Sequence, residues 1–278
     1  MRAYFPLPPT ISIEGIQDKI IGSITFLNCP NNRLKPFFSN KRYDDIVYLG
    51  IYLFNNQNWN LLGIQKCNPF DFLEINRNHL NVDDTQMIVV IAKKINDFKK
   101  ISITLPEPDS LKIDDSIVEQ RVSMNFSFLK SVSSYQGEYP LNMSELKKGS
   151  LFTFDTLKDS ENSSIKNYVI LMNLSKNYSF SERERIKIFN PENKDKFKYI
   201  DAFRNSFNIL ETNIYEKLLD SQKTIFLTSE TCSFIPIMLS VNLQTNQLSV
   251  EHTHPPTEYF FGPQKFEFMH LMKKIWIK

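Results

Sequence analysis

The stretch VEQRVSMNFSFL (118–129) alternates between apolar and polar residues, and it decides the fold class that we expect. Four apolar side chains fall on one side and four polar ones on the other: Val122, Met124, Phe126 and Phe128 against Arg121, Ser123, Asn125 and Ser127. Successive side chains of a strand point to opposite faces, so a period of two predicts a half-buried strand. Such a strand needs neighbours that bury its apolar face, and antiparallel sheets commonly carry this pattern.

Short segments rich in β-branched and aromatic residues recur along the whole chain. They are IIGSITFL (20–27), IVYLGIYLF (46–54), WNLLGIQK (59–66), MIVVIAKKI (87–95), ISITL (101–105), LFTFD (151–155), NYVILMNL (167–174), RIKIFN (185–190), TIFLTS (224–229), FIPIMLSV (234–241) and QLSVEH (247–252). FNNQNW (54–59) and residues 244–247 are typical of hairpin turns. This spacing predicts a mainly β protein with few short helices, built as an antiparallel β-sandwich or a jelly-roll-like fold.

Helical patterns are few. NILETNIYEKLLDSQ (208–222) places Ile214, Leu218 and Leu219 on one stripe, with Thr212 or Asn213 as the capping residue. The tail GPQKFEFMHLMKKIWIK (262–278) suits a helix or a strand equally well.

The stretch LPEPDSLKIDD (105–115) is a candidate domain boundary, because it contains two prolines and four acidic residues. It fits either a linker or an edge loop. We therefore expect an N-terminal β domain over 1–110 and a C-terminal β-rich domain over 111–278, two sandwich-like halves of the 278-residue chain.

The net charge is close to balanced, with 33 basic and 31 acidic residues and a formal value of +2. We therefore expect neither nucleic acid nor a membrane surface as a partner, although net charge says nothing of local distribution. The charge runs SERERIK (181–187) and NPENKDKFK (190–198) mix signs and are typical of solvated strand ends or loops. The apolar runs are too short to span a bilayer, and the N-terminus lacks the pattern of a signal peptide, so a cytoplasmic location is expected.

The three cysteines, Cys29, Cys67 and Cys232, are far apart in the chain and form no CxxC pair. We expect free thiols rather than a metal knuckle or a disulfide framework. The sequence also contains no GxGxxG, GxxxxGK[ST], GxSxG or HExxH motif, which disfavours nucleotide hydrolysis and Rossmann-type redox chemistry.

The stretch SVEHTHPPTEYFFG (249–262) contains the strongest candidate for a metal site. In a strand, His252 and His254 point to the same face, about 6.5–7 Å apart. Two prolines then end the strand, and Glu258 supplies a third, oxygen ligand. A His–His–carboxylate set with open positions suits non-haem Fe(II) or catalytic zinc. The alternatives are direct contact with an organic ligand and a simple pair of histidines at the rim of a strand.

This His-x-His-x3-Glu spacing resembles the first metal motif of the cupin family, whose β-barrel or jelly-roll fold uses those residues as ligands. The resemblance covers His252, His254, Glu258 and, loosely, Gly262. It departs from the family because no glycine precedes the first histidine, and only His270 follows for a second motif. The resemblance implies a metal-dependent enzyme with one divalent metal such as Zn or Fe.

The stretch SSYQGEYP (133–140) is a second candidate site, interpreted as a loop that follows a strand. Its Tyr135, Gln136, Glu138 and Tyr139 could stack on a sugar or a base and hydrogen-bond its rim. The alternative is a plain turn whose tyrosines pack on the core.

Three functions follow from these observations. The first is a non-catalytic ligand-binding or interaction module without a cofactor, with carbohydrate as the ligand class to test first. The second is the metal-dependent enzyme, so whether the chain is an enzyme stays open. The third is a structural subunit whose exposed strand edges pair with partners.

Overall fold

A computed structural model describes residues 4–28, 46–55, 58–80, 82–83, 86–94, 105, 121–136, 150–155, 164–174, 183–190, 192–219, 224–229 and 234–252. The protein is mainly β with antiparallel sheets, which confirms the predicted fold class at that level. One α-helix of eight residues occurs among the described residues. In the same part of the chain, no helix has the length and apolar character needed to cross a membrane.

The chain divides into two compact units. Nearly all of the chain up to Asn142 belongs to the first unit, and nearly all from Met143 belongs to the second. The predicted boundary between residues 110 and 111 lies outside the described residues. Strands on both sides of that boundary pair with one another in the first unit, because β3 (Ile20–Leu27) pairs with β8 (Arg121–Phe128) over seven positions.

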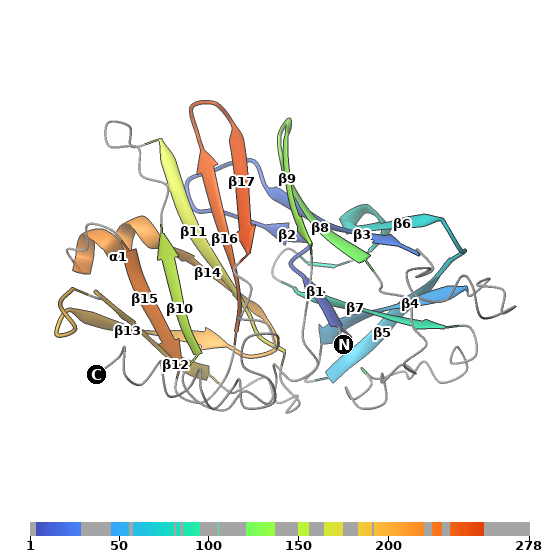
Figure 1. The fold of residues 1–278 in the computed structure, drawn as a ribbon, viewed down its shortest axis with the longest axis horizontal. Coiled ribbons are helices and arrows are strands. Elements are labelled where there is room, and N and C mark those ends of the chain that lie inside the picture. The colour runs from blue at the N-terminus through green and yellow to red at the C-terminus, as the bar shows by residue number, and fades with distance from the viewer. Residues whose placement is uncertain are drawn as a thin grey trace, which may run out of the picture. The chain divides into compact units, whose positions relative to one another are not determined.

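The part of the first unit that the structure describes forms two sheets (Figure 1). One sheet has the order β1-β7-β4-β5, formed by Tyr4–Leu7, Ile88–Lys94, Val47–Asn55 and Asn58–Cys67. The other has the order β2-β3-β8-β9, formed by Thr10–Ile11, Ile20–Leu27, Arg121–Phe128 and Ser131–Gln136; β6 (Phe72–Asn76) also pairs with β3, and a short 3₁₀ helix (Arg77–His79) follows it. The hairpin predicted at 54–59 is confirmed, since Asn55 pairs with Asn58.

The alternation in β8 is confirmed by the burial of its side chains. Its four apolar residues are at most 2% exposed, whereas Ser123, Asn125 and Ser127 are half-buried. On the polar face the Asn125 amide donates to Thr25 Oγ1 at 3.0 Å. The pattern therefore reports which face of this strand contributes to the core.

The chain passes from one sheet of the first unit to the other between β1 and β2. There the backbone lies against β3, because the Gly22 amide donates to the carbonyl oxygen of Pro9 at 3.0 Å. A Cβ atom at Gly22 would meet the Pro8 carbonyl oxygen, so the close approach requires glycine.

The described residues of the second unit form two four-stranded sheets and the helix. One sheet has the order β10-β15-β12-β13, formed by Ser150–Asp155, Thr224–Ser229, Arg183–Phe189 and Phe197–Phe203. The other has the order β14-β11-β16-β17, formed by Phe207–Glu211, Ile165–Met172, Ile235–Asn242 and Gln247–His252. β16 and β17 form the second predicted hairpin, drawn in orange to red in Figure 1.

Both sheets of the second unit contribute to one hydrophobic cluster. Its buried members are Val169, Leu171, Ile186, Ile188, Ala202, Leu210, Leu219, Ile225, Leu227 and Phe234. They come from β11 and β14 of one sheet, from β12, β13 and β15 of the other, from the helix, and from Phe234, which directly precedes β16. Burial of this shared cluster is the main favourable term that holds the two sheets of this unit together.

The helix α1 (Thr212–Leu219) begins at one of the two predicted capping residues, but it buries a different stripe from the predicted one. Residues 208–211, which precede the predicted caps, are part of β14. Ile214 and Leu218 are more than half exposed, while Leu219 is buried with Tyr215 packed beside it. The helix contacts β11 and β15, and these neighbours select the buried face.

Candidate ligand-binding face

The predicted metal set lies at the end of the described chain. β17 ends at His252, whose backbone is paired opposite Ile237. The predicted alternation along β17 is confirmed as far as it is described, with Leu248 buried and Ser249 exposed. His254 and Glu258 lie outside the described residues, so their role as ligands stays a prediction. Within the described residues, no group of three or more His, Cys, Asp or Glu side chains could hold a metal ion.

The predicted tyrosine loop begins as a strand. Tyr135 and Gln136 belong to β9, so the interpretation of residues 133–136 as a loop is wrong. The Tyr135 ring stacks on Phe126 of the neighbouring strand with a centroid separation of 6.4 Å, and burial raises the pKa of its hydroxyl above the usual range. Glu138 and Tyr139 lie outside the described residues, and a binding role for the set stays a prediction.

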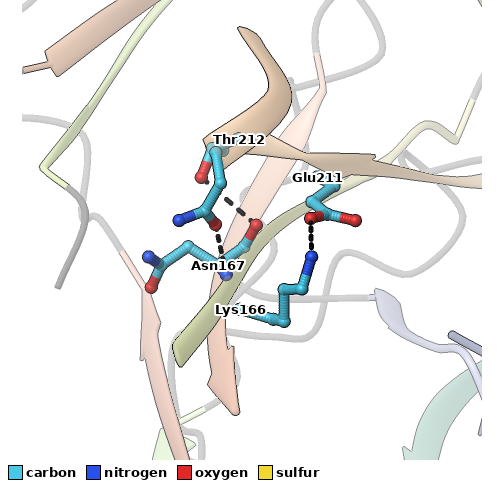
Figure 2. Close-up of polar contacts among 5 residues, drawn as sticks. Lys166, Asn167, Glu211 and Thr212 are labelled. Atoms are coloured by element: carbon cyan, nitrogen blue, oxygen red, sulfur yellow. Dashed lines mark hydrogen bonds and ion pairs between the residues drawn. The ribbon is translucent and has the colours of Figure 1, made fainter. Parts of the chain in front are cut away.

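A polar junction joins β11, β14 and the start of α1 (Figure 2). Lys166 Nζ and Glu211 Oε1 are 2.6 Å apart. The Thr212 hydroxyl donates to the backbone carbonyl oxygen of Asn167 at 3.2 Å, and the backbone N–H of Asn167 donates to Asn213 Oδ1 at 2.8 Å. The two predicted capping residues thus connect the start of the helix to β11 by hydrogen bonds. The polar groups of this junction bond to one another.

A surface separate from this polar junction contains neighbouring cations and exposed aromatic rings. We call it the cation–aromatic face, and it lies on the paired strands β12 and β13. Its cation row is Arg183, Arg185 and Lys187 on β12, and its aromatic row is Phe197, Tyr199 and Phe203 on β13. The register places both rows on one side of the sheet, because Arg183 pairs with Phe203 and Lys187 with Tyr199. In the described sheet β13 has a neighbour on one side only, so the aromatic row follows a sheet edge.

The cations lie over the rings. Arg185 Cζ is 4.0 Å from the centroid of Tyr199, and Arg183 Cζ is 5.4 Å from that of Phe203. Lys187 Nζ is 4.5 Å from the centroid of Phe197. Each such contact contributes roughly 0.5–1 kcal/mol at an exposed site, and together they restrict the orientation of long side chains that would otherwise be mobile.

The rings of the aromatic row stay open to solvent despite these contacts. Phe197, Tyr199 and Phe203 are 46%, 40% and 39% exposed, which is unusual for three large rings on one short strand. The first two meet edge to face with centroids 5.5 Å apart. On the side of β15 the same face is closed, because Phe189 is buried against Phe226.

The local charge on the hairpin is positive, although the whole chain is nearly neutral. The exposed or half-buried charged residues between Arg183 and Phe203 are Arg183, Arg185, Lys187, Lys194, Lys196, Lys198, Glu192, Asp195 and Asp201, a net charge of +3. Asp201 is the acidic residue that β12 and β13 contribute to this face, and Asp201 Oδ2 lies 3.7 Å from Arg183 Nη1. The potential beside the aromatic row is therefore positive.

A buried ionic network fixes β12 from the opposite side of the sheet. Glu184, whose side chain is 5% exposed, accepts from Arg204 Nη2 at 3.0 Å and from the Ser229 hydroxyl at 3.0 Å. The network links β12 to β15 and to the turn after β13. The cation–aromatic face is thus built on a rigid hairpin rather than on a mobile loop.

Sequence reasoning missed this face because it treated 181–187 and 190–198 as separate charge runs. The signal was present as two period-two patterns, R-x-R-x-K at 183–187 and F-x-Y at 197–199 with Phe203 beyond. Neither pattern shows that the two segments are neighbours, since only the strand register brings them together.

Comparisons with protein-family models, with curated proteins and with solved structures found no match for this chain.

Proposed function

We propose that this protein is a binding module that holds an anionic polymer on the cation–aromatic face. The observation that carries the proposal is the row of three cations beside three exposed rings on one rigid hairpin. Phosphate, sulfate and carboxylate groups pair with Arg and Lys by charge-assisted hydrogen bonds. A ligand with repeated negative charges can therefore contact the whole row.

The spacing of the cations favours a polymer over a small anion. Alternate residues of a strand are about 6.5–7 Å apart, so the row extends over roughly 13 Å. A single phosphate would reach one or two of these cations, whereas a chain with repeated charges reaches all three. Electrostatic attraction would also increase the association rate at low salt.

Carbohydrate is the ligand class that the sequence predicted first, and an acidic polysaccharide belongs to the proposed class. The proposal includes a sandwich-like architecture for each unit, supported by the core cluster that both sheets of the second unit share. The cytoplasmic location and the metal-dependent alternative stay predictions.

The proposal is tested with a polyanion that carries charge but no rings. We expect the full chain to bind fluorescently labelled long-chain polyphosphate, measured by fluorescence anisotropy. The logarithm of affinity should fall with the logarithm of salt concentration with a slope of about −2, since three cations each contribute roughly 0.7 for a single-stranded polyanion. Heparin serves as a second probe for acidic polysaccharide.

A matched pair of triple variants separates the face from overall charge. The face variant is Arg183→Gln, Arg185→Gln, Lys187→Gln; the control is Lys66→Gln, Lys130→Gln, Lys217→Gln, which removes the same charge at exposed positions elsewhere. The face variant should bind about tenfold more weakly, because three exposed contacts of about 0.5 kcal/mol each amount to roughly 1.5 kcal/mol. Equal weakening in both variants, or no binding by the natural chain, would overturn the proposal.

A further inference from the structure

We infer that the anionic polymer is a single-stranded nucleic acid whose bases stack on the aromatic row. This inference departs from the expectation that nucleic acid is not a partner, which rested on the net charge of the whole chain and not on the positive charge of this hairpin. This inference rests on the proposed function and gives a role to the aromatic row, which charge alone does not explain. A polyanion without rings would need the cations only. Three rings at about 40% exposure next to them are an additional feature that needs its own ligand chemistry.

The alternation of cations and rings matches the composition of a single strand. Every nucleotide carries one phosphate and one planar base, and single-strand sites combine a basic track with rings on which successive bases stack. Here the basic track is β12 and the stacking positions are on β13, side by side through the register of the two strands. The rings of Phe197 and Tyr199 provide stacking positions for two successive bases, and Phe203 provides a further position beyond Asp201.

The spacing of the first two rings agrees with an extended single strand. Phe197 and Tyr199 are alternate residues about 6.5–7 Å apart, which is about twice the ~3.4 Å rise per phosphate of a stacked strand, and Phe203 lies roughly 13 Å beyond Tyr199. A strand whose bases leave their own stack to meet protein rings is stretched in this way. A duplex keeps its bases inside, so its base faces cannot reach the aromatic row.

Asp201 favours a nucleic acid over a densely sulfated polysaccharide. Asp201 is the residue of the face that comes between Tyr199 and Phe203 along β13, and it pairs with Arg185 of β12. A carboxylate repels a polymer with several charges per unit, whereas it can accept a hydrogen bond from a base, from the N3–H of thymine or from the exocyclic amino group of the other bases.

The outer edge of β13 is disfavoured as a site where another strand could pair. Lys198 is exposed on this edge strand, and edge lysines are a common device that prevents strand addition. The aromatic row is therefore available to a ligand on the face, while pairing along the edge is disfavoured.

The test compares probes with equal backbone charge, with and without bases. The full chain is titrated into labelled oligothymidine of about 12 nucleotides, within the ~4–16-nucleotide range of single-strand sites. Parallel titrations use an abasic oligonucleotide of the same length, a duplex of the same length, polyphosphate and heparin. We expect oligothymidine to bind at least tenfold more tightly than the abasic strand and the duplex.

Two variants assign that difference to the rings. Phe197→Leu, Tyr199→Leu, Phe203→Leu keeps apolar bulk without a planar face, and it should make the affinity for oligothymidine equal to the affinity of the same variant for the abasic strand. Circular dichroism of the variant checks that the chain is still folded. Tyr199→Trp retains an aromatic ring, and its additional emission should be quenched by oligothymidine and not by the abasic strand.

The outcomes separate the inference from the proposed function. Equal affinity for oligothymidine, the abasic strand and polyphosphate overturns the inference and leaves the proposed function in place. Tighter, ring-dependent binding of heparin overturns it in favour of an acidic polysaccharide. Absence of binding to every probe overturns both.

Discussion

Removal of the Glu184 carboxylate should destabilise the second unit strongly, although the residue lies within a run of charges. The side chains of Glu184 and Arg204 are 5% and 18% exposed, with the carboxylate oxygen 3.0 Å from the guanidinium nitrogen. Breaking one side of a buried pair costs about 3–5 kcal/mol, because the remaining charge stays in a region of low polarity. Arg204 retains some contact with solvent, so we expect Glu184→Ala to cost about 3 kcal/mol.

The same hairpin supplies the control. Asp201 and Arg183 form an ion pair at 3.7 Å, but their side chains are 59% and 65% exposed. An exposed pair contributes at most about 1 kcal/mol, so Asp201→Ala should have little effect. Urea unfolding followed by circular dichroism measures both changes. In thermal unfolding, a loss of about 3 kcal/mol corresponds to a decrease in Tm of roughly 6–12 °C.

A double variant tests the physical reason for the loss. Glu184→Met with Arg204→Met removes both charges and keeps apolar volume, so it should recover most of the stability lost in Glu184→Ala. Equal, small effects of Glu184→Ala and Asp201→Ala would refute the claim that the first pair is buried. A double variant as unstable as the single variant would show that packing, rather than an uncompensated charge, causes the loss.

The remaining predictions concern the helix, alkaline pH, thiols and metal. Thr212→Val keeps the shape of a buried side chain and removes its hydrogen bond to Asn167, so the free energy of unfolding in urea should fall by about 1 kcal/mol, with Thr212→Ser close to the natural chain. Burial raises the pKa of Tyr52 to about 12, so deprotonation favours the unfolded chain: the contribution of Tyr52 to stability should hold below pH 10 and decrease by roughly 3 kcal/mol toward pH 12. The alkaline loss should therefore be smaller by about this amount in Tyr52→Phe when urea midpoints are compared across this range. Three free thiols should titrate after denaturation without reductant, and Cys67, which is buried with its pKa raised by that burial, should react slowly in the native chain; a count below three would contradict this. If the predicted metal set holds an ion, a chelator should lower Tm and His254→Ala should abolish that response, whereas an unchanged Tm with chelator would argue against a bound metal.

The local sequence determined where most strands lie. The bounds expected from segments rich in β-branched and aromatic residues agree with the structure for β3 and β15, and the polar–apolar alternation of β8 matches its buried and half-buried faces. These strands are predictable because strand-favouring residues, or an alternation that encodes the burial of one face, are already complete within six to eight residues.

Strands whose faces do not differ clearly in polarity were missed. β13 is exposed over most of its length, so FKYIDAF has no apolar face that contrasts with a polar one. β14 was not predicted, because its residues directly precede the predicted helix caps and form no strand pattern of their own, and in the structure it pairs with β11. In both cases the neighbouring strand, rather than local preference, determined the secondary structure.

The candidate site belongs to tertiary structure almost entirely. Charged residues at 183–187 and rings at 197–203 are visible in the sequence, but their meaning depends on the register that puts Arg183 opposite Phe203. The same holds for Glu184, whose place inside the unit follows from its pairing position opposite buried Ala202. A one-residue shift in that register would reverse which side chains face the core, and the energy that prevents the shift comes from the packed cluster of both sheets, which no single segment contains.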